Sequence, residues 1–152
     1  MSNQLLSKFG EVLKLAISKA FSKSNLQKIG DDTTDDLVKR VRDGQGSDNG
    51  RKTSLKSLAQ NYVNARKRSR ALSSKTSASK SNLTFTGQML DSIDATVKGT
   101  NIIIEPSNTR ADQKAAFVSK ERPFLNLTKE EEAKLVKDLT RELDISIQKI
   151  FK

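Results

Sequence analysis

NLTFTGQMLDSIDATVKGTNIIIEPS, residues 82–107, followed by RPFLNLTKEEE, residues 122–132, decides the fold of this chain. Two runs rich in β-branched residues, 95–97 and 102–104, predict strands, because such side chains suit a pleated, half-buried surface. Between them Lys98-Gly99-Thr100-Asn101 predicts a turn in which Gly99 takes a positive φ angle. Pro106 ends the second strand, since proline cannot donate a hydrogen bond to a sheet. The segment therefore predicts one antiparallel β-hairpin.

Helix starts and a corner flank this hairpin. Thr86-Gly87 predicts the opening of a short helix, and Arg122-Pro123 must be extended because the residue before proline disfavours the helical region. Thr128 and Glu131 form a capping box for a closing helix that continues to residue 150. We expect Phe124 and Leu125, which lie in the RPFL corner at residues 122–125, to be buried against this helix. The expected apolar face of the helix is Val136, Leu139, Leu143, Ile147 and Ile150, helped by Leu135 and Phe151.

The first fifty residues predict a helical arm and a flexible loop. Apolar residues recur at helical spacing from Leu5 to Phe21, which indicates an amphipathic helix over about residues 3–22. We expect it to pack on its own core or on a neighbouring subunit; a membrane surface is the lower-ranked alternative.

Further along, residues 25–32 are expected to form a connector that ends at Gly30-Asp31, after which Thr33 or Thr34 caps a short helix. Residues 43–50, DGQGSDNG, predict a flexible loop. This loop lacks the Gly-Lys-Ser/Thr of a phosphate-binding loop and the twelve-residue pattern of an EF-hand.

A basic helix and a basic loop follow. We expect Thr53 or Ser54 to cap a helix that runs to about residue 71, with Tyr62 on its buried face. The serine-rich segment 71–82 predicts a flexible linker. The candidate contact residues of this region are Arg66, Lys67, Arg68, Arg70, Lys75 and Lys80.

Nearly all of the net charge of +10 lies in this region. Residues 51–80 carry nine basic and no acidic side chains, residues 1–50 carry eight and seven, and residues 81–152 carry eleven of each. Such asymmetry is typical of proteins with an acidic or nucleic-acid neighbour. A solvated basic helix end, favoured by the helix dipole, is the alternative explanation.

Composition argues against an enzyme. The chain has no histidine and no cysteine, which excludes the commonest general base, thiolate metal sites and disulfides. Its acidic residues fall at helix starts and turns, where capping and solvation explain them. We therefore expect no catalytic residues, no metal and no cofactor. No apolar run approaches the roughly 20 residues that span a bilayer, so we expect a soluble protein without a membrane partner.

The order of the motifs resembles the virion-morphogenesis and tail-completion proteins of tailed phages. In those proteins a basic helix precedes a TG-x-(M/L)-L-x-S-I segment, a hairpin, an RPFL-x-L corner and an acid-rich closing helix. The resemblance covers about residues 50–150. Residues 108–120 depart from the family, because they lack its aromatic–alanine and Gln-Gly segment. The matching residues are Thr86, Gly87, Leu90, Ser92, Ile93, Arg122, Pro123, Phe124, Leu125 and Leu127.

The resemblance implies a structural virion protein, assembled in the host cytoplasm and located in the neck or tail of the virion. Such a subunit forms a sixfold or twelvefold ring between the head connector, or portal, and the tail, and its basic residues meet packaged DNA or an acidic ring. The alternative is a small basic nucleic-acid-binding protein, although the chain has no recognition motif or aromatic platform.

The expected fold is therefore α+β. Long N- and C-terminal helices and a basic middle helix are expected to pack on a small antiparallel hairpin. Residues 1–50 are expected to form an N-terminal arm with its loop, and residues 51–152 the α+β core.

Overall fold

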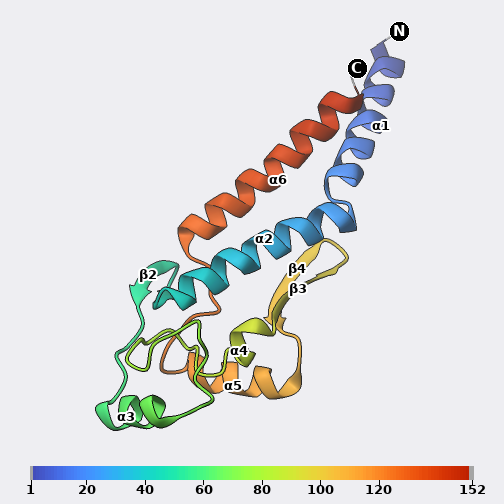
Figure 1. Ribbon diagram of the computed structural model, residues 1–152. Helices are drawn as coiled ribbons and strands as arrows, with labels where there is room; N and C mark the ends of the chain where they lie inside the picture. Colours follow the sequence, from blue (N-terminus) through green and yellow to red (C-terminus); the bar gives the residue numbers. More distant parts are fainter. Residues whose placement is uncertain (1, 151–152) are drawn as a thin grey trace.

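The computed structural model describes residues 2–150, with side chains from residue 9 onward. Within that range the fold is α+β, as predicted, with six helices and two separate two-stranded antiparallel sheets. The molecule is elongated (Figure 1), with a helical stem at one end and a broader body at the other. The stem brings the first and last helices of the chain together.

The stem consists of the first and last helices, α1 (Ser2–Ala20) and α6 (Lys129–Ile150). They run side by side (Figure 1) and pack against each other. Ala16 and Ala20 are buried in α1. Val136 is 60% exposed, so the predicted apolar face of α6 is wrong at this position. The predicted contributions of Leu5 and Phe151 lie outside the side chains that the structure describes.

Helix α2 (Lys23–Arg42) replaces the connector and short capped helix that the sequence predicted. Ser22 is its N-cap and accepts a hydrogen bond from the Asn25 amide at 3.4 Å. Thr33 lies inside the helix, where its hydroxyl donates to the Ile29 carbonyl at 2.7 Å. Gly30 also lies inside the helix and does not end a connector. It lets α2 approach the hairpin closely, because a Cβ at this position would lie 2.8 Å from the Ala95 Cβ.

The predicted hairpin is confirmed as β3 (Ile93–Lys98) paired with β4 (Asn101–Pro106). Gly99 in the turn has a φ of 64°. Residues Ile93, Ala95 and Val97 are buried, as alternation along a strand with one buried face requires. The helix that makes the main contact with this hairpin is α2, rather than the basic middle helix.

A second hairpin occupies the segment that was predicted to be a flexible loop. Strands β1 (Gln45–Asp48) and β2 (Arg51–Ser54) pair in antiparallel register, with Asn49 and Gly50 as the two-residue turn. Both turn residues have positive φ angles, 49° and 74°, which is the type I′ geometry that Asn-Gly favours. The strand placement also shows that Thr53 and Ser54 do not cap a helix.

Three shorter helices complete the body: α3 (Gln60–Arg68), α4 (Gln88–Asp91) and α5 (Thr109–Ser119). Helix α3 starts later than predicted, and its N-cap Ala59 makes no side-chain hydrogen bond. The predicted short helix after Gly87 is confirmed as α4, and α5 precedes the RPFL corner. Asn108 caps α5 by accepting from the Ala111 amide at 2.9 Å.

One core joins these elements. Its buried members come from α2, the segment after β2, α4, β3, α5 and the RPFL corner, so they lie on both sides of the expected domain boundary at residue 50. Residues 23–50 therefore belong to the same packed body as the rest of the chain. The members are Leu37, Val38, Val41, Leu55, Leu90, Ile93, Ala115 and Phe124.

Candidate interaction surfaces

Arg66 is a buried structural residue and does not belong to the exposed basic surface. It is 2% exposed, and its guanidinium donates to the backbone carbonyls of Lys80 at 3.1 Å, Ser77 at 3.2 Å and Thr84 at 3.0 Å. It also lies 5.8 Å from the Tyr62 ring centroid, a distance at which cation–π attraction contributes. Arg66 therefore fixes the following loop and is not available to a polyanion.

The serine-rich segment 71–82 is held in place rather than being a free linker. Asn82 is fully buried; its side-chain amide donates to the Arg42 carbonyl at 3.1 Å, and its Oδ1 accepts from the Thr76 hydroxyl at 2.9 Å. The Ser73 amide donates to the Phe85 carbonyl at 2.7 Å. The segment is therefore held against the body, because these hydrogen bonds satisfy the backbone carbonyls of Arg42 and Phe85.

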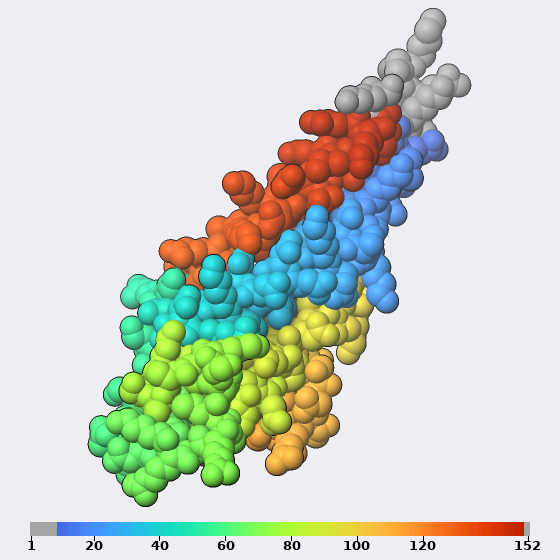
Figure 2. Space-filling view, in the orientation of Figure 1, coloured from blue at the N-terminus to red at the C-terminus, as the bar shows by residue number. Residues whose placement is uncertain are grey.

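The remaining basic candidates form an exposed surface at one end of the molecule. We call Lys67, Arg68 and Arg70 the basic end; all three are exposed, and within residues 9–150 none forms a salt bridge. Residues 51–80 gather at the end of the molecule opposite the stem (Figure 2). Lys75 is 3.5 Å from the Asp91 carboxylate, and Lys80 is exposed. The structure thus brings together three of the six candidates as an uncompensated cluster.

An apolar groove lies beside the basic end, between α3 and α5. We call it the α3–α5 groove; its volume is about 270 Å³. Tyr62 on one wall is 45% exposed, which corrects its predicted burial, and Phe117 on the outer surface of α5 is 75% exposed. Cationic side chains line it without an acidic residue: Arg66, Lys114 and Arg122. The groove therefore combines apolar walls with positive charge.

The RPFL corner is held by Arg40, a residue that the sequence analysis missed. Arg40 donates from Nε to Glu131 at 2.7 Å and from Nη2 to the carbonyls of Phe124 at 3.1 Å and Asn126 at 2.9 Å. Both charges are nearly buried, with 5% of the Arg40 side chain and 11% of the Glu131 side chain exposed. Arg40 follows Leu37 by three positions, so helical spacing places it on the buried side of α2 and could have revealed it.

The predicted capping box is confirmed at the start of α6. The Glu131 amide donates to the Thr128 hydroxyl at 3.2 Å, and the Thr128 amide donates to Glu131 Oε2 at 2.8 Å. The other Glu131 oxygen accepts from Arg40. One carboxylate therefore caps α6 and ties it to α2.

Some residues of the family-like motif lie in the core, and others shape turns of the backbone. Leu90, Ile93 and Phe124 are buried in the same cluster, and Leu125 and Leu127 pack against it. Gly87 caps α4 with a φ of 87°, a left-handed conformation that glycine adopts without strain.

The other motif residues take part in hydrogen bonds. The Ser92 hydroxyl donates to the Met89 carbonyl at 2.8 Å, and Arg122 donates to the Ser57 carbonyl at 3.3 Å. The Pro123 carbonyl accepts from the Ser47 amide at 3.0 Å, whereas Thr86 is exposed. Most of the motif therefore serves packing and chain geometry.

A second charged surface, of opposite sign, lies on α2. We call Asp31, Asp32, Asp35 and Asp36 the acidic stretch; no basic residue lies between positions 29 and 38. Only Asp36 forms a salt bridge within residues 9–150, with Lys134 of α6. Lys134 also donates a hydrogen bond to Asp36 within this salt bridge. This hydrogen bond, together with the nearby charges of Asp138 and Asp32, raises the pKa of Lys134 above its ordinary value of 10.5.

Within the described part of the chain, no group of three or more acidic side chains is arranged to hold a metal ion. No helix among the described residues is both long and apolar enough to cross a bilayer. The chain matches no protein-family model, no curated protein and no solved structure.

Proposed function

We propose that this chain is a structural virion protein of a tailed phage, a ring-forming neck or tail-completion subunit that joins the head connector to the tail. The observation that carries the proposal is the order of its motifs: basic helix, TG segment, hairpin, RPFL corner and acid-rich closing helix. In the virion, the subunit would contact copies of itself, the neighbouring connector and tail proteins, and packaged DNA.

The packing of the motif residues supports this proposal. Leu90 and Ile93 lie more than thirty positions from Phe124, yet all three are buried in one core. The two short sequence patterns therefore both contribute to the core, as expected of a motif that specifies a fold.

The exposed apolar side chains also support a subunit of a larger assembly. Tyr62 and Phe117 are exposed beside the α3–α5 groove, and Leu15, Ile17 and Val136 are exposed on the stem at 48%, 48% and 60%. Exposed aromatic side chains beside an apolar groove are typical of surfaces that bury in neighbours.

Sedimentation velocity of the purified chain at micromolar concentration, with and without duplex DNA, tests the proposal. A closed ring in the absence of DNA, seen as a single fast species and as rings in negative-stain images, is the expected result. A chain that stays monomeric at all concentrations and ionic strengths contradicts it.

A second candidate function is that of a small basic nucleic-acid-binding protein, which the uncompensated Lys67, Arg68 and Arg70 favour. In that case the chain would bind DNA as a monomer. The slope of affinity against salt would then fall when these three residues are replaced by glutamine, because each phosphate contact contributes to the slope.

A further inference from the structure

We infer that copies of this chain bind one another head to tail, with the basic end of one copy against the acidic stretch of the next. The inference rests on the proposed ring function and names the two surfaces that would close the ring.

The acidic stretch carries more negative charge than its own chain neutralises. Asp31 and Asp35 are one helical turn apart on the exposed side of α2, with Asp32 beside them, and none of the three forms a salt bridge within residues 9–150. Within residues 9–150 the salt bridge to the stretch is that of Lys134 with Asp36, and Asp31 accepts a hydrogen bond from the neutral Gln27 side chain at 2.8 Å. The surface can therefore accept additional cations from outside the chain.

The basic end carries positive charge that its own chain does not neutralise. Lys67 and Arg68 lie in the last turn of α3 and Arg70 follows it, with no acidic residue anywhere between positions 51 and 80. Tyr62, on the same helix, adds exposed apolar area beside the charges, together with the α3–α5 groove. A contact here would bury apolar surface and pair charges, and complementary charge fixes the register of such contacts.

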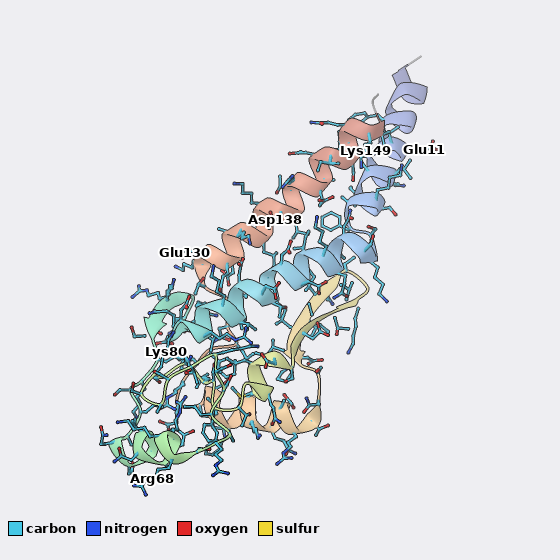
Figure 3. The ribbon with its side chains drawn as sticks, in the orientation of Figure 1. Glu11, Arg68, Lys80, Glu130, Asp138 and Lys149 are labelled. Carbon is cyan, nitrogen blue, oxygen red and sulfur yellow. The ribbon has the colours of Figure 1, made fainter. Side chains whose placement is uncertain are left out.

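The two surfaces lie on different parts of the molecule, which decides the kind of assembly. Arg68 is at the far end of the body (Figure 3). The acidic stretch lies in the middle of α2, where Asp36 pairs with Lys134 of α6. Asp138, whose charge also acts on Lys134, lies part-way along α6 (Figure 3). A contact between two different patches is heterologous, so each bound copy still offers one free patch. Such contacts add further copies, and they close into a ring when the rotation between neighbouring copies permits it, as the proposed function requires. A polyanion could satisfy the basic end alone, but it would leave the acidic stretch without a role.

Charge reversal in two matched variants tests the inference. The first is K67E/R68E/R70E, which leaves the buried Arg66 in place; the second is D31K/D32K/D35K, which keeps Asp36 bonded to Lys134. Each variant alone is expected to weaken self-association at least about tenfold, because like charges then face each other. Mixing the two in equal amounts should restore assembly, since every contact then joins opposite charges. Sedimentation velocity at low and high salt measures this, and circular dichroism confirms that each variant is folded.

Several outcomes overturn the inference. If the wild-type chain forms rings and either folded variant also assembles normally, or the mixture fails to restore assembly, the contact lies elsewhere and the ring function stands. If K67E/R68E/R70E assembles normally but loses affinity for duplex DNA, the basic end is a nucleic-acid contact. If the wild-type chain never assembles, both the inference and the ring function fail.

Discussion

Replacing Arg40 with methionine should lower the free energy of unfolding by about 3–5 kcal/mol, because it leaves a buried carboxylate without its partner. Only 11% of the Glu131 side chain is exposed, so water has little access to replace the lost guanidinium. The carbonyls of Phe124 and Asn126 lose their charged donor as well. A methionine fills much of the same volume, so the expected loss comes mainly from charge and hydrogen bonding.

A double-mutant cycle separates the pair from the rest of the site. Glu131→Gln keeps an oxygen that can accept from the Thr128 amide but removes the charge opposite Arg40. The double variant R40M/E131Q should therefore be less destabilised than the two single variants predict when added, with a coupling of about 1–3 kcal/mol.

Urea unfolding followed by circular dichroism at pH 7 provides the measurement, at a protein concentration where the chain is monomeric so that association does not add to stability. The coupling should persist at high salt, since buried pairs are screened far less than exposed ones. A loss below about 1 kcal/mol for Arg40→Met, with additive single effects, would refute the view that this pair joins α6 to α2.

Three further substitutions test the packing of the body. Phe124→Ala should cost about 3–5 kcal/mol, as for a core aromatic, whereas a loss under 1 kcal/mol in the same urea assay would mean that its surroundings collapse around the gap. Thr128→Ala should cost about 0.5–2 kcal/mol while Thr128→Ser stays close to wild type; equal losses would show that the hydroxyl does not act as the cap. Gly30→Ala should destabilise by about 1–3 kcal/mol despite its better helix propensity, because the new Cβ would meet Ala95; a more stable protein in thermal melts would show that the hairpin can move away.

Local signals predicted the β3–β4 hairpin and the capping box, since each depends on a few neighbouring residues. The turn around Gly99 and the Thr128–Glu131 exchange need no distant partner to be specified. The β1–β2 hairpin also had its signal, the Asn49-Gly50 pair, but the polar strands around it lack the usual apolar alternation. These strands are fixed from outside: the Ser47 amide donates to the Pro123 carbonyl at 3.0 Å.

The errors came from distant contacts that override local preference. Gly30 suggested a break in the chain, yet the close approach of Ala95 makes glycine the fitting residue inside a helix. Charge alone does not distinguish Arg66, which meets buried carbonyls, from its exposed neighbours. Its three acceptors come from positions 77, 80 and 84, and only the folded loop brings them together.

The pairing of α1 with α6 has a consequence for synthesis of the chain. Ribosomes make α1 before α6, with the other described elements between them, so the side of α1 that packs on α6 lacks this partner until α6 has been made. Contacts between residues so far apart in sequence form slowly, and apolar surface that waits in this way promotes aggregation. Nascent chains of this protein therefore have a window in which a chaperone, or α6 of an already finished copy, can reach α1 before its own α6 exists.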